Sequence, residues 1–414
     1  MRIVCGKWAA AEVERIAGRS AAVDAAAEKT ARKIIAAVRR TGDKALLQYA
    51  NKFDGLEAQP LRVAAGQMES ALSSVPADFR QALNTAARNI RQFCEWQRHK
   101  EFRRQIQPGI CVGQVIRPVA SVGCYVPGGR YPLPSSLLMT VLPAQTAGVP
   151  RIVVASPRPA PETLAAAALC GVTEFYRVGG AQAIAALAYG TASVPQVDKI
   201  VGPGNKFVTA AKKQVAFDCG IDFLAGPTEV LVLSDDGEPE FIAADLVAQA
   251  EHDPDASAIF ITSSLELARE VNQAVSRMSS GNAIARQSLK ANGAILIAST
   301  HAQAVEWANA IGPEHVTVGA EDVAAITSAG SIFVGNYSPQ ALGDYAAGPN
   351  HVLPTGNVAR IRGGLSVTDF VKVISVQEVS RDGLRRLAPV VETLAEAEGL
   401  KAHAESVRAR CAHA

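Results

Sequence analysis

The sequence predicts an α/β fold built on parallel sheet. Its middle part alternates short apolar runs of strand length with alanine-rich runs of helical length. Residues 152–155 precede a helical run near 161–170, and residues 175–178 precede another at 181–189. Repeated βα units of this kind are typical of parallel sheets covered by helices. The alternation continues through apolar runs at 230–233, 258–262, 294–298 and 331–334.

The two ends of the chain differ from this middle part. In the first hundred residues, apolar side chains recur at spacings of three and four, which indicates one buried helix face. They are Phe79, Leu83, Ala86, Ile90 and Phe93, and Pro108-Gly109 then breaks the pattern. The βα units form two blocks divided near residue 229, and the last forty residues have a helical pattern again. We therefore expect two α/β blocks with a helical element at each end.

Length and composition narrow the class of protein. A chain of 414 residues exceeds one compact core, and 48% hydrophobic with 19% charged residues is typical of a globular protein. A formal charge of +2 gives no reason to expect nucleic acid. Lys7 and Glu12 interrupt the only apolar stretch at the start, so a signal peptide is not expected. A membrane span is not expected either, because the sequence has no stretch of about 18 uninterrupted apolar residues. Seven cysteines without a CxxC pair suggest free thiols in a reducing cytoplasm.

Histidines stand beside or near carboxylates in four motifs, although the chain has only seven histidines. Imidazole and carboxylate groups ligate zinc and move protons near neutral pH. A metal-assisted enzyme is therefore the first hypothesis. The motifs are Gln249-Ala-Glu-His252-Asp, Gly-Pro-Glu314-His315, Gly-Asp344 leading to Asn-His351, and Glu398-Gly-Leu-Lys-Ala-His403.

The spacing within the motifs favours different roles. Gln249 and His252 are three residues apart, so a helix would place them on one face. The adjacent Glu314 and His315 can point to different faces, one to abstract a proton and the other to polarise water. Glu398 and His403, in contrast, are five residues apart, and a helix would not place them on one face. Taken alone, each motif suits a structural role better: a helix end, a loop ion pair, a capped turn and an exposed terminus.

Three glycine-rich segments lie where a strand gives way to a loop or helix, a place where backbone N–H groups can meet phosphate. None of them reads GxGxxG, so the usual dinucleotide fingerprint is missing and tight turns explain them equally well. Ser135-Ser136 has no nucleophile motif around it. The glycine-rich segments are Tyr125-Val-Pro-Gly-Gly-Arg130, Gly179-Gly-Ala-Gln182 and Gly202-Pro-Gly-Asn205.

Taken together and in order, these segments resemble the histidinol dehydrogenase family over nearly the whole chain. So many ordered matches are far more specific than any single motif. The resemblance rests on Gly42-Asp-Lys-Ala-Leu, Val122-Gly-Cys-Tyr-Val-Pro-Gly-Gly, Gly179-Gly-Ala-Gln-Ala-Ile, Asp198-Lys-Ile-Val-Gly-Pro-Gly-Asn, Ala225-Gly-Pro-Thr-Glu-Val, the four histidine motifs, Asn350-His-Val-Leu-Pro-Thr, Gly364-Leu-Ser-Val-Thr-Asp-Phe and Glu396-Ala-Glu-Gly-Leu-Lys-Ala-His.

The resemblance implies a role for each matching residue. Glu314 and His315 match the family's catalytic acid/base pair. The zinc ligands, which also hold the substrate together with His315, would be Gln249, His252, Asp344 and His403. Further substrate-binding residues would be Thr228, His351 and Glu398. Residues holding NAD would be Tyr125, Gln182 and Asn205.

The resemblance also implies an architecture and an activity. It predicts two incomplete Rossmann-like domains with parallel sheets plus small helical N- and C-terminal elements. The boundaries would be 1–24, 25–123 with 230–366, 124–229 for the NAD-binding domain, and 367–414. The family is a homodimer in which the C-terminal element reaches the partner's active site. It oxidises L-histidinol to L-histidine through the aldehyde, with NAD and one Zn²⁺ per subunit, as the last step of histidine biosynthesis.

Some positions depart from the commonest family pattern and leave a second enzyme open. Thr228 stands where serine is usual, and both carry a hydroxyl. Arg130-Tyr-Pro-Leu and Gly226-Pro-Thr-Glu look similar to a paralogous group, the sulfopropanediol 3-dehydrogenases, in which an arginine could meet a sulfonate. The segments 313–315 and 396–403 keep the histidinol pattern, so we favour histidinol. A scaffold protein with a dead site is the non-enzyme alternative, but every transferred site residue is present.

Overall fold

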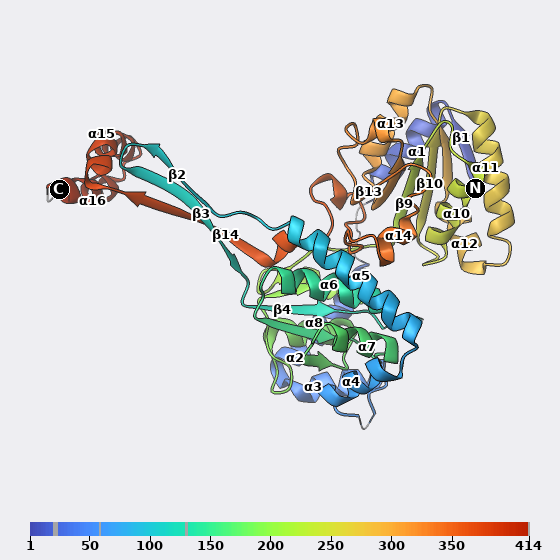
Figure 1. Ribbon diagram of the computed structural model, residues 1–414, viewed down its shortest axis with the longest axis horizontal. Helices are drawn as coiled ribbons and strands as arrows, with labels where there is room; N and C mark the ends of the chain where they lie inside the picture. The colour runs from blue at the N-terminus through green and yellow to red at the C-terminus, as the bar shows by residue number, and fades with distance from the viewer. Residues whose placement is uncertain (20–23, 58, 129–130, 413–414) are drawn as a thin grey trace.

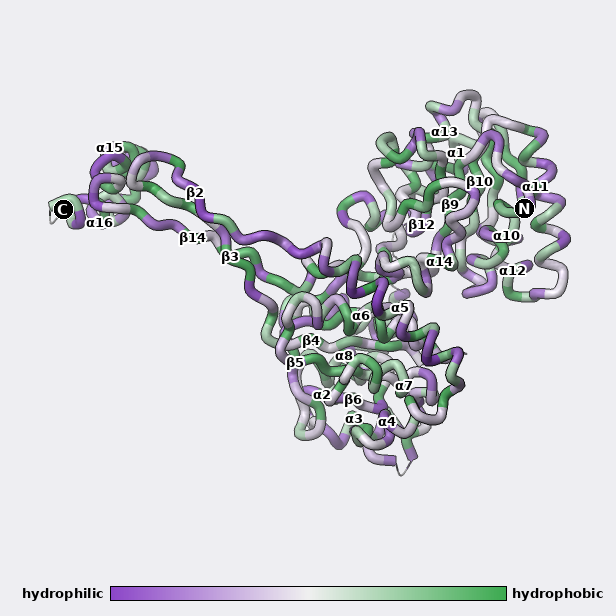
Figure 2. The backbone as a smooth tube through the Cα atoms, in the orientation of Figure 1, coloured by the Kyte–Doolittle hydropathy of each residue, from purple (hydrophilic) through white to green (hydrophobic). Residues whose placement is uncertain are grey.

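The chain folds into two α/β lobes and one long arm, as Figure 1 shows. This computed structural model describes residues 1–19, 24–57, 59–128 and 131–412. The six-strand lobe carries the N-terminus, and the arm carries the C-terminus far from both lobes. In Figure 2 the strands inside the lobes are mostly apolar, whereas the arm mixes apolar with polar segments. The lobes therefore each have a core of their own.

The six-strand lobe is built on a parallel sheet with strand order β1-β11-β10-β9-β12-β13. Its middle strands are short apolar runs; β10, for example, is buried along its whole length. Strands buried on both faces in this way are expected in parallel sheets. The strands are β1 (Arg2–Cys5), β9 (Glu229–Leu233), β10 (Ser257–Thr262), β11 (Ala294–Ile297), β12 (His315–Val318) and β13 (Ser331–Val334).

Helices cover both faces of this sheet. Side chains such as Leu231 and Ile259 pack with residues of α1 and α13, whereas Val230 and Phe260 pack with α10, α11 and α12 on the opposite face. The alternation follows from the period-two pleat of a strand. The helices of this lobe are α1 (Lys7–Ala17), α10 (Pro239–Ala250), α11 (Leu265–Met278), α12 (Ala283–Asn292), α13 (His301–Ile311) and α14 (Gln340–Tyr345).

The five-strand lobe has a second parallel sheet with strand order β6-β5-β4-β7-β8. Numbered within the lobe, this is 3-2-1-4-5, the order of a Rossmann-type sheet. Its strands are β4 (Ser121–Tyr125), β5 (Arg151–Ala155), β6 (Glu174–Tyr176), β7 (Lys199–Val201) and β8 (Gly220–Ile221). Its helices are α2 (Ala25–Thr41), α3 (Asp43–Tyr49), α4 (Ala65–Ser74), α5 (Ala77–Trp96), α6 (Pro134–Thr146), α7 (Pro161–Leu169), α8 (Gly180–Tyr189) and α9 (Lys206–Val215).

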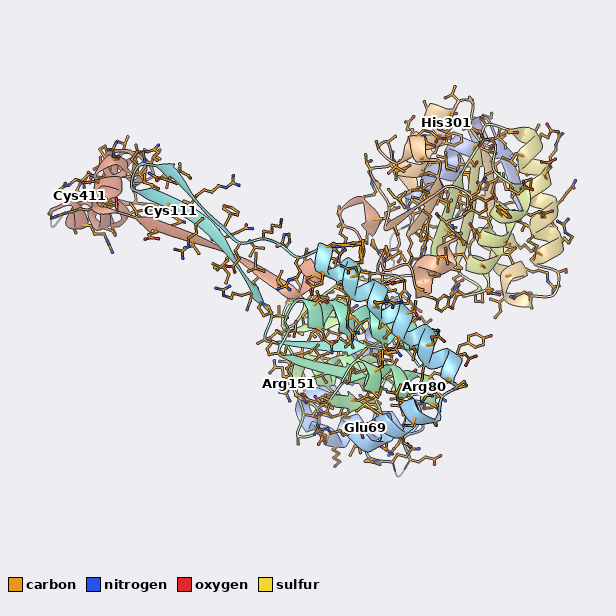
Figure 3. The ribbon with its side chains drawn as sticks, viewed as in Figure 1. Glu69, Arg80, Cys111, Arg151, His301 and Cys411 are labelled. Atoms are coloured by element: carbon orange, nitrogen blue, oxygen red, sulfur yellow. The ribbon has the colours of Figure 1, made fainter. Side chains whose placement is uncertain are left out.

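The arm is a three-stranded antiparallel ribbon that ends in two helices. Strand β3 pairs with β14 from Val371↔Pro118 to Val379↔Ile110, and with β2 on its other side. Figure 3 shows Cys111 and Cys411 on this arm, away from the lobes. The arm consists of β2 (Phe102–Gln107), β3 (Ile110–Pro118), β14 (Val371–Val379), α15 (Arg381–Ala397) and α16 (Lys401–Ala412).

The expected α/β class with parallel sheets is confirmed, but both ends differ in detail. The N-terminal region holds a strand, β1, which pairs with β11 at the edge of the six-stranded sheet. The C-terminal element is not helical throughout, because the strand β14 follows a short 3-10 turn at Val367–Phe370. The predicted grouping of 25–123 with 230–366 also differs from the packing, since α2, α3 and α5 pack in the five-strand lobe. No helix in the described part of the chain is long and apolar enough to span a bilayer.

Candidate functional site

Three candidate residues, Thr228, Glu314 and His315, meet at the amino ends of two neighbouring strands. Strand β12 begins at His315 and pairs in parallel with β9, with His315 opposite Val230. This register brings Glu314 beside Thr228, just before β9. The Glu314 Oε2 atom accepts hydrogen bonds from Thr228 Oγ1 at 2.5 Å and from the backbone N–H of Glu229 at 2.9 Å. Glu314 is 7% exposed and His315 3% exposed, so strand pairing fixes a buried acid/base pair.

The ring of His315 is held by one nitrogen and leaves the other available. Its Nδ1 lies 3.0 Å from the carbonyl oxygen of Glu229, which can only accept, so Nδ1 donates this hydrogen bond. The same nitrogen lies 3.6 Å from Glu314 Oε2. On the opposite side, Nε2 is 3.7 Å from Asp344 Oδ1 and has no hydrogen-bond partner among the described residues. A buried imidazole nitrogen is therefore left for a ligand.

The charges around this pair favour proton transfer near neutral pH. Burial raises the pKa of Glu314, and the charge of His315 together with the hydrogen bond from Thr228 opposes that rise. Burial lowers the pKa of His315, but the Glu314 and Asp344 carboxylates outweigh it and raise the pKa to about 9. Both groups can therefore hold a proton in this site, which is what general acid–base chemistry requires.

The end of helix α10 brings Gln249 and His252 to the same edge of the sheet. The helix follows β9 and runs back across the sheet, so its last turn lies near the amino ends of the strands. Gln249 is buried and its side-chain amide donates to Thr228 Oγ1, whereas His252 is exposed just beyond the helix. Burial raises the pKa of Asp344, but nearby imidazoles, His252 among them, outweigh it and keep the pKa below its usual value. An ionised carboxylate with an imidazole and an amide at the same edge of the sheet suits a cation.

His351 connects this cluster to the five-strand lobe. Its Nδ1 donates to the backbone carbonyl of Asp344 at 2.6 Å, and its Nε2 lies 3.3 Å from Ser136 Oγ on α6. A cavity of about 280 Å³ is lined by His315, Asp344 and His351 together with apolar side chains such as Phe333. Ser136 was not expected here, because no sequence motif surrounds it. Only the packing of α6 against the 350–355 segment brings it into contact.

Two candidate residues do not join the cluster within one chain. Glu398 follows α15 and His403 lies in α16, and both are exposed. These helices lie at the tip of the arm, far from β9, β12 and α14 (Figure 1). Within the described part of this chain, no group of three or more His, Cys, Asp or Glu residues is placed to hold a metal ion. Within one chain, the four residues that the resemblance assigns to zinc therefore do not all come together.

The three residues expected at NAD do converge, in a separate cavity of the five-strand lobe. Tyr125, Gln182 and Asn205 line one cavity of about 370 Å³. The Tyr125 hydroxyl accepts from Gly180 N at 3.1 Å, and Gln182 Nε2 donates to Asp54 Oδ2 at 3.0 Å. The cavity lies at the carboxyl ends of β4, β5 and β7, the edge where open parallel sheets bind ligands. Arg130, a residue the sequence singled out, lies outside the described residues.

Comparison with known proteins decides the family. The family model described as histidinol dehydrogenase matches residues 17–411. The chain belongs to the histidinol dehydrogenase family. It is 47% identical to the histidinol dehydrogenase of Methanothermobacter thermautotrophicus, covering 91% of this chain and 92% of that one. The Bacillus anthracis histidinol dehydrogenase is 43% identical, with 99% of each chain covered.

The crystal structure of histidinol dehydrogenase from Elizabethkingia anophelis matches with a TM-score of 0.94 at 34% identity, covering 99% of this chain and 98% of that one. The resemblance read from the sequence motifs is thereby confirmed, and the family is one of oxidoreductases in histidine biosynthesis.

Glu229 is a site residue for which no role was predicted, although it stands inside the Gly-Pro-Thr-Glu motif. Its Oε1 accepts from Gly356 N at 3.3 Å, and its buried Oε2 has no hydrogen-bond partner among the described residues. Burial, and then the charge of Glu314, raises its pKa from 4.5 to about 7. A carboxyl whose pKa is raised by folding is easier to ionise in the unfolded chain. The stability that the protonated Glu229 carboxyl contributes is therefore fully present below about pH 4.5 and is lost as the pH rises through 7.

The Glu229→Gln variant should for this reason be stabilised more at pH 8 than at pH 5. The full difference is roughly 3 kcal/mol in the free energy of unfolding, at about 1.36 kcal/mol per pKa unit. Thermal unfolding of both proteins at the two pH values measures it. Glu270→Gln, an exposed change on α11, should show no such pH dependence. An equal shift in Tm at both pH values for Glu229→Gln would contradict a raised pKa.

Proposed function

We propose that this protein is a zinc- and NAD-dependent histidinol dehydrogenase of the cytoplasm. It would oxidise L-histidinol to L-histidine through L-histidinaldehyde, the last step of histidine biosynthesis. The observation that carries the proposal is the buried Glu314–His315 pair, whose His315 lines one cavity together with Asp344 and His351. In a chain of this family, these are the residues that the resemblance implies for the chemistry.

The two members of the pair would take different steps. His315, with Nε2 directed at the cavity, would remove the hydroxyl proton of histidinol. Glu314 would accept a proton from water as that water attacks the bound aldehyde, because its carboxylate is buried and held by Thr228 and the Glu229 N–H. Two NAD molecules, bound one after the other, would each accept one hydride. Thr228, His351 and Glu398 would contact the substrate.

The residues present fit a zinc ion. Gln249, His252 and Asp344 offer an amide oxygen, an imidazole and a carboxylate, and His403 of a second copy would add another imidazole. Nitrogen and oxygen donors of this kind suit Zn²⁺, and a set containing a neutral amide favours an open site that also accepts substrate. When bound, the ion would orient the substrate and polarise its hydroxyl oxygen.

Substitution of His252 tests the zinc assignment. His252→Ala should lose its bound zinc, from about one ion per chain to nearly none, and with it the activity, since one ligand of an open site is removed. The side chain is exposed, so the fold should survive with stability changed by about 0.5 kcal/mol or less. Elemental analysis and circular dichroism measure both, and the exposed His99→Ala serves as the control. Full zinc content in His252→Ala would show that the ligand assignment is wrong.

The arm supports a homodimer with shared active sites. Its strands and helices extend away from the lobes while carrying exposed apolar side chains, which is unusual for a free surface. A second copy of the chain would cover them and would receive Glu398 and His403 at its own cluster. The exposed apolar residues of the arm include Phe102, Ile106, Val373, Ile374, Leu394 and Leu400.

Substrate preference separates this proposal from a sulfopropanediol 3-dehydrogenase. We expect a higher kcat/KM with L-histidinol than with 2,3-dihydroxypropane-1-sulfonate, since Glu398 and His403 keep the histidinol pattern. Initial rates of NADH formation with both compounds under the same conditions measure this. A higher kcat/KM for the sulfonate would assign the chain to the paralogous reaction. No turnover of either compound by zinc-loaded protein would favour a non-catalytic role.

A further inference from the structure

Arg158 occupies a position at which Rossmann-type sheets read the cofactor. In the order β6-β5-β4-β7-β8, strand β5 is second after the first strand β4. The group near the carboxyl end of that second strand usually contacts the adenosine ribose, an acid for the 2′-hydroxyl or an arginine for a 2′-phosphate. Strand β5 ends at Ala155, and Arg158 follows three residues later.

The backbone and surroundings of Arg158 set it apart. Its φ is 43°, in the left-handed region that non-glycine residues rarely adopt. Such conformations are often kept where a side chain must be aimed at a ligand. The side chain passes Gly55 and is exposed, and it makes no hydrogen bond or ion pair with the described residues. Burial raises the pKa of Asp54, and hydrogen bonds from Gly179 and Gln182 and, last, the charge of Arg158 partly oppose that rise.

Two neighbouring cavities meet at this residue. Arg158 lines the cavity of about 370 Å³ that holds Tyr125 and Gln182, and also a smaller one of about 170 Å³. Ser156 and Thr163 add hydroxyl groups to the smaller cavity, and Arg158 is the only charged residue among its described lining. A guanidinium group with hydroxyl groups beside it offers the positive charge and the hydrogen-bond donors that bind a phosphate.

We propose that Arg158 binds a phosphate group of the dinucleotide at the carboxyl end of β5. The inference rests on the proposed NAD site and adds a residue that reads the cofactor's charge. The phosphate is either the one on the 2′ position of the adenosine ribose, in which case the chain also accepts NADP, or the pyrophosphate common to both dinucleotides. The position after the second strand favours the 2′-phosphate.

Binding measured without substrate separates this inference from the catalytic proposal. Calorimetric Kd values for NAD, NADP and ADP-ribose would be compared in unaltered protein, Arg158→Ala, Arg158→Lys and Arg88→Ala. Arg88 is an exposed arginine on α5 that lines neither cavity. Loss of a charge-assisted hydrogen bond should raise Kd about tenfold or more in Arg158→Ala, with partial retention in Arg158→Lys.

The pattern across ligands identifies the phosphate. A rise for NADP alone assigns the 2′-phosphate, and an equal rise for NAD, NADP and ADP-ribose assigns the pyrophosphate. Unchanged Kd values in Arg158→Ala, matching Arg88→Ala, would overturn the inference while leaving the NAD site in place. Failure of the unaltered protein to bind any dinucleotide would overturn the NAD site itself, and this would be seen before any substitution is made.

Discussion

Glu314→Gln should release about one NADH per active site from L-histidinol and then nearly stop. The first oxidation needs a base for the hydroxyl proton, which His315 would supply. The second needs water activated at the aldehyde, and a neutral amide cannot accept its proton. We expect the aldehyde step to fall by roughly 10²- to 10⁴-fold, the usual contribution of a general base, and the alcohol step by far less.

The isosteric amide should leave the fold intact, because its oxygen can still accept from Thr228 and from the Glu229 N–H. Rapid-mixing measurements with L-histidinol and with L-histidinaldehyde, each with NAD, resolve the two steps. His315→Ala should instead slow both steps, and the exposed Glu306→Gln should slow neither. Equal losses in both steps for Glu314→Gln would contradict the division of labour between the pair.

Part of the fold and of the candidate site could be predicted from the sequence. The apolar runs that became β9, β10 and β11 are visible because a strand buried on both faces needs continuous apolar side chains. The Glu314–His315 pair and Gln249 were found as motifs, and the pairing of β12 with β9 explains why they meet. Judged by periodicity alone, each motif suits a structural role better. Only the ordered set of motifs along the chain indicates the family.

Other features carry little local signal. Strand β1 is only four residues long, and its partner β11 lies nearly three hundred residues away in the sequence. All six residues of β2 are exposed, so this strand shows no buried face that a pattern could reveal. Packing between distant segments brings Asp54 into the cavity of Tyr125 and Gln182, and Ser136 into contact with His351. Glu398 and His403 could not be understood as a local pair, and one chain's structure leaves them exposed at the end of the arm.

A mixed dimer tests directly whether the arm serves the neighbouring copy. Suppose that one chain carries His315→Ala and the other His403→Ala. Each homodimer should be nearly inactive, since every site lacks one essential group. If the arm crosses, one site of the mixed dimer receives both defects and the other receives none. Purified through two different affinity tags, the mixed dimer should recover up to about half of wild-type activity, on the additive logic of independent sites.

The matched control places both substitutions in one chain and pairs it with an unaltered chain. With crossed arms, each site then carries one defect and activity should stay near zero. If His403 served its own chain, the two results would exchange: the first mixed dimer would stay inactive and the second would keep half of the activity. Because the two dimers contain the same four altered and unaltered side chains, differences in stability or zinc loading affect them alike. The difference in activity between the two mixed dimers therefore reports only which site the arm serves. The expectation rests on the exposed position of α16 at the end of the ribbon, far from the Glu314, His315 and Asp344 cluster of the same chain in Figure 1.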